Sequence, residues 1–242
     1  MKISDADYAS SATASWRVAT AILVVLAASL WADVALAHAV TLGDQGYIQE
    51  ITGVHLISFV YLGAKHMVTG YDHLLFLAGV IFFLYGMKEI GIYVTLFAIG
   101  HSTTMLAGVW FEFGINSYII DAIIGFSVAY KALDNLGAFQ KWFGYQPDTK
   151  LATLIFGFLH GFGLSSKILD YNISPDGLLP NLLAFNVGVE LGQLMALALI
   201  LVFMTRWRST SSFARQAYAV NVLMMTAGFA LMGYQIAGYV VA

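Results

Sequence analysis

The chain has 242 residues, of which 60% are hydrophobic and only 10% are charged, and its mean hydropathy is +0.78. Soluble domains carry about 25% charged residues, so this composition predicts an integral membrane protein with one bundle and no second, soluble domain. The net charge of −3 offers no basic surface and excludes nucleic-acid binding, and the absence of cysteine excludes disulfides, thiolate metal sites and thiol nucleophiles.

The first 37 residues have the pattern of an export signal. Lys2 and Arg17 precede an apolar stretch at 18–30, and Ala35-Leu36-Ala37 offers a small-x-small cleavage site. Residues 1–37 are therefore predicted to be a signal peptide or, as the alternative, an uncleaved N-terminal helix. A single transmembrane bundle at 38–242 follows.

Six apolar runs come next, and their length favours helices over strands because a backbone in lipid must satisfy its own hydrogen bonds. The first run can extend back through Phe59. The predicted fold is all-α, a polytopic transmembrane helix bundle with six spans plus the N-terminal signal or a seventh hydrophobic helix. The six predicted spans are 70–85, 90–111, 118–136, 151–169, 182–204 and 218–240.

Basic residues gather in alternate connections between these runs, and by the positive-inside rule those connections are cytoplasmic. The other connections contain only Lys65 and Lys167 among the basic residues. This pattern predicts a multi-pass protein of the bacterial inner membrane, with the segment from His66 to His73 facing the periplasm. The basic residues of the first group are Lys88, Lys141, Lys150, Arg206, Arg208 and Arg215.

The segment from His66 to His73 stands at the mouth of the first run. Thr69 and Asp72 have the spacing of a capping box, which would explain both without any ligand. The two histidines are seven residues apart, about 10 Å along an unbroken helix, too far for one metal ion. A break near Gly70 would let His66 fold back toward His73 and Asp72, so all three are candidate metal ligands.

Further ionisable groups lie deep inside later runs, where they are rare unless they face a protein interior or an aqueous path. His101 and His160 lie in the middle of the second and fourth runs, and Glu190 lies within the fifth. A single such histidine is explained by an interhelical hydrogen bond, worth about 1 kcal/mol in membranes. Several of them together predict a polar, metal-handling site within the bundle.

Amides accompany the carboxylate of the fifth run. Asn186, Glu190 and Gln193 are spaced to project along one helical face, and are predicted to act together. Asp121 opens the third run, as a supporting residue or an interfacial cap, whereas Asp134 closes it and is predicted to be solvated. Without cysteine, these ligands suit a divalent transition metal ion: nickel, zinc, copper, iron or manganese.

At these residues the chain resembles the HupE/UreJ family of hydrogenase and urease accessory membrane proteins, in its second branch. The resemblance implies a nickel permease with an N-terminal signal, although the entry motif has proline where this chain has Met67. Cleavage after Ala37 would make His38 the first residue, with an amine and an imidazole for a metal. The matching pieces are His66-x3-Gly70-x-Asp72-His73-Leu74-Leu75-Phe76-Leu77, Gly100-His101-Ser102-Thr103-Thr104, Phe156-Gly157-Phe158-Leu159-His160-Gly161-Phe162-Gly163 and Phe185-Asn186-Val187-Gly188-Val189-Glu190-Leu191-Gly192-Gln193.

The leading interpretation is a permease, rather than an enzyme, that admits a divalent transition metal from the periplasm. Entrance residues would capture the ion, and deeper residues would relay it through several moderate sites. Two alternatives stay open: a membrane metalloenzyme with a fixed ion, and a non-catalytic subunit of a larger membrane complex. The predicted partners are the metal ion, the lipid bilayer and, under the last alternative, other membrane subunits. The entrance set is His66, Asp72 and His73, and the deeper set is His101, His160, Asn186 and Glu190.

Overall fold

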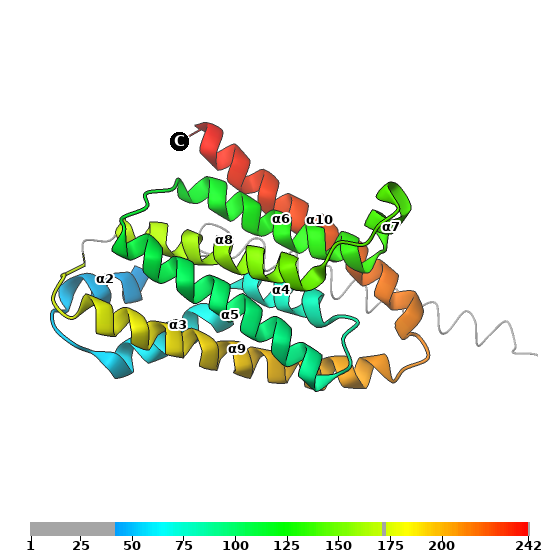
Figure 1. Cartoon of the computed structure of the whole chain (residues 1–242), viewed down its shortest axis with the longest axis horizontal. Helices are drawn as coiled ribbons and strands as arrows, with labels where there is room; N and C mark the ends of the chain where they lie inside the picture. The colour runs from blue at the N-terminus through cyan, green and yellow to red at the C-terminus, as the bar shows by residue number, and fades with distance from the viewer. Residues whose placement is uncertain (1–41, 171–172, 242) are drawn as a thin grey trace, which may run out of the picture.

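A computed structural model describes residues 42–170 and 173–241, and within these ranges every regular element is a helix. The predicted all-α class is therefore confirmed for this part of the chain (Figure 1). The predictions for residues 1–37 and for His38 lie outside the described residues. The helices are α2 Leu42–Glu50, α3 Leu56–Thr69, α4 Tyr71–Ile81, α5 Met87–Trp110, α6 Ser117–Asn135, α7 Ala138–Phe143, α8 Thr149–Leu169, α9 Leu178–Arg208 and α10 Phe213–Val241.

Each of the six apolar runs is helical, but only four helices in the described ranges, α5, α8, α9 and α10, are long and apolar enough to cross a membrane. A total of six or seven spans is therefore not confirmed. The α4 helix is apolar but has only 11 residues. The α6 helix carries three buried charged residues, Asp121, Lys131 and Asp134, which lower its hydropathy although its neighbours cover them.

Three helix pairs make the most extensive contacts: α3 with α9, α5 with α8, and α6 with α10. Glycine permits the close approach in each pair. A Cβ atom on Gly188 of α9 would lie 2.9 Å from the amide nitrogen of Ala64 in α3, and one on Gly157 of α8 would lie 2.6 Å from the carbonyl oxygen of Phe97 in α5. Figure 1 shows α9 along one edge of the bundle and the α6–α10 pair along the other.

The first predicted span is a broken helix. It starts earlier than 70, at Leu56, and is interrupted at Gly70, whose backbone is extended with φ −73° and ψ 101°. The guanidinium of Arg208, at the end of α9, donates to the carbonyl oxygen of Leu84 just beyond α4, at 2.8 Å. Together α3 and α4 therefore follow α9 along most of its length, as two half-helices that meet near the middle of the bundle.

The bundle has two chemically different ends. The connections 82–86, 136–148 and 209–212, with the adjoining helix termini, carry most of the basic residues and are called the basic end. The connections 51–55, 111–116 and 173–177 form the opposite end. There the side chain of Asn181 bridges two segments, because its Nδ2 donates to the carbonyl oxygen of Gly53 at 2.9 Å and its Oδ1 accepts from the amide of His55 at 2.8 Å.

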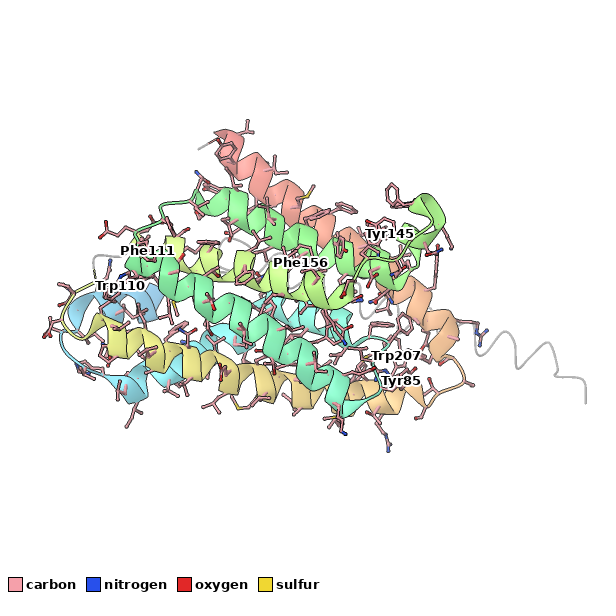
Figure 2. All side chains as sticks on the ribbon, in the orientation of Figure 1. Tyr85, Trp110, Phe111, Tyr145, Phe156 and Trp207 are labelled. Atoms are coloured by element: carbon pink, nitrogen blue, oxygen red, sulfur yellow. The ribbon has the colours of Figure 1, made fainter. Side chains whose placement is uncertain are left out.

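Large aromatic side chains mark both ends of the bundle (Figure 2). Tyr85, Tyr145 and Trp207 lie toward the basic end, whereas Trp110 and Phe111 lie toward the opposite end. All except Trp207 are more than half exposed. Tyr and Trp are enriched where a membrane protein meets the two lipid–water interfaces. Their separation therefore supports a bundle that crosses a bilayer from end to end.

Candidate metal centre

The break at Gly70 brings two histidines from opposite sides of it into contact. His66 lies in the last turn of α3 and His73 in the first turn of α4, and their ring centroids are 5.1 Å apart. An unbroken helix would separate them by about 10 Å along its axis. The prediction that a break lets His66 fold back toward His73 is therefore confirmed as geometry.

Glycine is required at this break because side chains crowd its Cα atom. A Cβ atom on Gly70 would overlap Nδ1 of His73 and lie 3.2 Å from Oδ1 of Asp72. The capping-box interpretation is wrong, since Thr69 ends α3 and its hydroxyl donates to the carbonyl oxygen of Lys65 at 2.8 Å. The carboxylate of Asp72 instead lies 3.1 Å from Nδ1 of His73.

Two more histidines reach the same place from the α5–α8 pair. His101 of α5 and His160 of α8 have ring centroids 6.0 Å and 5.2 Å from that of His73, and all three side chains are fully buried. A Cβ atom on Gly161 would overlap the carbonyl oxygen of His101. Glycine beside His160 thus lets α5 and α8 approach closely enough to present both rings to α4. We call His66, His73, His101 and His160 the histidine cluster.

One nitrogen each from His66, His73 and His101 lies within 4.8 Å of the others. Nitrogen atoms of imidazole lie about 2 Å from a bound transition metal, so two ligands of one ion are at most about 4 Å apart. Small ring rotations would therefore bring these three nitrogens around one ion. No other such group of histidine and carboxylate ligands occurs in the described part of the chain.

Hydrogen bonds donated by Nδ1 set the tautomers of two rings in the cluster. Nδ1 of His160 is 2.7 Å from the carbonyl oxygen of Phe156, and Nδ1 of His73 faces the carboxylate of Asp72. Both partners are oxygen acceptors, so Nδ1 donates in each case and the lone pair stays on Nε2. Carboxylates and carbonyls orient metal-binding histidines in this way in many proteins.

His101 provides the strongest sign that a ligand belongs here. Its side chain is 0% exposed, yet neither ring nitrogen has a hydrogen-bond partner among the described residues. Leaving a buried polar group without a partner costs about 1–3 kcal/mol, so native proteins supply a partner, a water or an ion. A metal ion or a water bound at His101 would remove this cost.

The three polar residues of the fifth predicted run, which were expected to act together, lie on different sides of α9. Asn186 and Gln193 of α9 are buried, whereas Glu190 is exposed on the outside of the bundle. The reason is that Gly188 and Gly192 pack against α3, and a residue two positions from each of them points to the other side of a helix. Glu190 is therefore not among the residues that the structure brings together.

The amides of α9 each retain an unused acceptor. Nδ2 of Asn186 donates to the carbonyl oxygen of Leu182 at 3.1 Å, and Nε2 of Gln193 approaches that of Val94 at 3.5 Å. The amide oxygens of both side chains are buried and have no hydrogen-bond partner within the described ranges. These oxygens are polar groups that a hydrated ion or a water molecule inside the bundle could use.

Asp121 is not a helix cap, because the side chain of Asn116 caps α6 by accepting from the amide of Tyr118 at 3.0 Å. Asp121 is instead buried, and its Oδ2 accepts from Nζ of Lys167 at 2.8 Å. The charge pattern of the sequence placed Lys167 in a connection, but it lies in the last turn of α8. Its spacing of seven from His160, which places both on one helical face, was the signal that could have identified it.

Another buried polar group lies at the basic end of the bundle. It contains Asp134, contrary to the prediction that this residue is solvated. The carboxylate of Asp134 pairs with Lys131, accepts from the amide of Gln146, and accepts from the hydroxyl of Thr149 at 3.2 Å. Residues 146–149 fold back over the end of α6, and this fold supplies the partners. We call Lys131, Asp134, Gln146 and Thr149 the basic-end cluster.

Comparison with known protein families gives a match. The family model described as HupE / UreJ protein matches residues 42–242, which include the whole histidine cluster. Neither the curated proteins nor the solved structures give a match.

Proposed function

The chain belongs to the HupE/UreJ family, and on this premise we propose that it is a membrane permease for a divalent transition metal ion. The family is associated with metal-accessory functions, and the resemblance noted in the sequence favours nickel. Imidazole and carboxylate ligands also suit zinc, cupric copper and ferrous iron. The ion is here a substrate that passes through the bundle.

One observation carries this proposal. Four fully or almost fully buried imidazoles from four helices converge, and His101 among them has no hydrogen-bond partner in the described part of the chain. A group of polar side chains in an apolar bundle would be expected to satisfy itself if it only held helices together. Unused ring nitrogens favour a transient ligand.

The residues of the metal centre would have different roles in binding the ion. His66, His73 and His101 would replace the hydration ligands of the ion, each through one ring nitrogen. Asp72 would hold the ring of His73 in its binding tautomer and supply a negative charge close to the dication. His160, next to His73, would accept the ion when the first set releases it.

The same geometry indicates a route. The basic end is cytoplasmic by the positive-inside rule, so the opposite end would face the periplasm and admit the ion. Discontinuous helices in transporters place half-helix ends at the substrate near the bilayer midplane. The break at Gly70 would have this role, since α3 ends and α4 begins beside the histidine cluster.

The test is nickel uptake by proteoliposomes that contain the purified protein and a metal-sensitive dye. We expect His101→Leu to lower uptake at limiting nickel by at least about tenfold, because a metal site loses about 10–100-fold even when only an outer group that supports a ligand is removed. Glu89→Gln, which removes an exposed carboxylate at the basic end, is the matched control and should change little. Equal uptake by the wild type, His101→Leu and liposomes without protein would refute the proposal.

Burial of the histidine cluster also favours a second candidate, a membrane metalloenzyme with a resident ion. Elemental analysis distinguishes the two. A permease should lose its metal during dialysis against a weak chelator, whereas a resident ion should remain at one per chain. A protein that binds no metal at all, and that co-purifies with other membrane proteins, would instead be a non-catalytic subunit.

A further inference from the structure

A buried ion pair joins two helices on the side of the histidine cluster that faces the opposite end of the bundle. Nζ of Lys167 in α8 is 2.8 Å from Oδ2 of Asp121 in α6, and the two side chains are 12% and 9% exposed. Lys167 lies seven residues after His160, on the same face of α8 and about 10 Å further along its axis. An ion that entered from the opposite end would reach this pair first.

The pair is also close to the cluster in electrostatic terms. The charge of Lys167 acts on His66, and the charges of Asp72 and His73 act on Asp121. A bare ammonium group at this position would repel a dication from the cluster, and repulsion is strong where little water screens it. The carboxylate of Asp121 cancels that repulsion as long as the pair is intact.

The basic-end cluster provides an internal standard for a purely structural pair. Lys131 and Asp134 are three residues apart on one helix, and two further donors, from Gln146 and Thr149, hold the same carboxylate. Asp121 and Lys167, in contrast, belong to different close helix pairs, α6–α10 and α5–α8. Their bond therefore breaks when these two pairs separate, whereas the bond between Lys131 and Asp134 does not.

Lysine is suited to an exchangeable role. Its ammonium is a compact point charge on a flexible stem, and near the end of a span it can extend toward the interface and be hydrated there. Lys167 lies in the last turn of α8, so water at the opposite end is within reach of a rotated side chain. Asp121, with its short side chain, stays in place on α6.

We propose that Asp121 is an outer binding site for the incoming divalent cation and that Lys167 is the tethered cation which this ion displaces. The inference rests on the proposed permease function and adds a step before the histidine cluster. The ion replaces the ammonium at Asp121, and Lys167 turns toward the opposite end. When the ion moves on to His66 and His73, Lys167 returns to Asp121 and closes the route behind it.

Charge variants of the two residues test this step because they should act in opposite directions. Lys167→Met removes the cation that competes for Asp121, so the full chain in nanodiscs should bind two nickel ions in calorimetry with nickel chloride, instead of one. Asp121→Asn leaves the ammonium uncompensated and should raise the KM for nickel uptake by about tenfold or more while one ion still binds. The double variant should return toward the wild-type KM.

Lys167→Arg separates an exchangeable pair from a structural one. Arginine keeps the charge but forms two parallel hydrogen bonds to a carboxylate, so it is harder to displace. We expect it to raise the KM for uptake, whereas a pair that only held the helices together would be preserved or strengthened. Lys88→Met and Glu89→Gln change exposed charges at the basic end and are the matched controls.

The inference is overturned if Lys167→Met still binds one ion, or if Lys167→Met and Asp121→Asn shift KM in the same direction. Where one of these variants does not fold, as judged by gel filtration and circular dichroism, Lys167→Gln and Asp121→Ser carry the same expectations. Failure of the proposed function is distinguishable, because it would leave uptake insensitive to His101→Leu as well.

Discussion

The histidine cluster and the basic-end cluster are both buried groups of polar residues, but they use their hydrogen-bonding capacity differently. At the basic end, the carboxylate of Asp134 has three side-chain partners, and the amide of Asn135 donates at 2.9 Å to both Gly79 and Asn221. In the centre, His101 keeps two ring nitrogens without a partner in the described part of the chain. A group whose hydrogen bonds are satisfied stabilises a fold, whereas a group with unsatisfied ring nitrogens indicates a site for a ligand.

The largest expected effect is on stability, at the basic end. Lys131→Met would leave the carboxylate of Asp134 buried with its charge uncompensated, and removing one partner of a buried pair costs about 3–5 kcal/mol. The free energy of unfolding in mixed detergent micelles measures the change. Nickel uptake per folded molecule should stay the same. A loss of uptake without a loss of stability would contradict the purely structural role given to the basic-end cluster.

The second prediction concerns the centre. His101→Leu should weaken nickel binding by about 10–100-fold, yet the free energy of unfolding of the metal-free protein should be unchanged or higher. The reason is that an apolar side chain of similar size replaces a buried imidazole without partners. In the wild type, nickel at 100 times its Kd should add about 2.7 kcal/mol of stability, and this increment should disappear in the variant.

A smaller effect is expected at the break between the half-helices. In Gly70→Ala the new methyl group would overlap Nδ1 of His73, so the ring must move away from the position in which Asp72 orients it. Overpacking of this kind costs about 1–3 kcal/mol, and we expect nickel affinity to fall by about tenfold. Calorimetry measures the affinity, and an unchanged Kd would show that the break does not set the geometry of the cluster.

The smallest effect is expected at Glu190. Because its side chain is exposed on the far side of α9 from Gly188 and Gly192, Glu190→Gln should change nickel affinity by no more than about twofold. A large loss would place this carboxylate in the metal route, as the sequence alone suggested. Measured beside His101→Leu, the Glu190→Gln variant compares an ionisable group on the outside of the bundle with one inside it.

Much of the fold and of the cluster was predictable from the sequence. Apolar runs identified the helices, and a glycine between two histidines indicated a break that brings His66 to His73. His101 and His160 were identified because ionisable groups deep in apolar runs need a special environment. These inferences depend on composition and local spacing, which a sequence displays directly.

The remaining features depend on the rotation of each helix about its axis, which an all-apolar run does not reveal. Glu190 was expected to face inward, but Gly188 and Gly192 direct α9 the other way. The pairing of Asp121 with Lys167 joins residues 46 positions apart on different helices. The prediction of six or seven spans is not confirmed, because α4 is short and α6 contains buried charges.

The three glycine-mediated helix pairs have a mechanical consequence. Contacts within each pair bring backbone against backbone, so a pair can shift as one rigid body more easily than its members can slide past each other. The imidazoles are distributed over these bodies: His66 belongs to the α3–α9 pair, His101 and His160 to the α5–α8 pair, and His73 to the unpaired α4. An ion bound by His66, His73 and His101 would connect these bodies, and its departure would free them to move relative to one another.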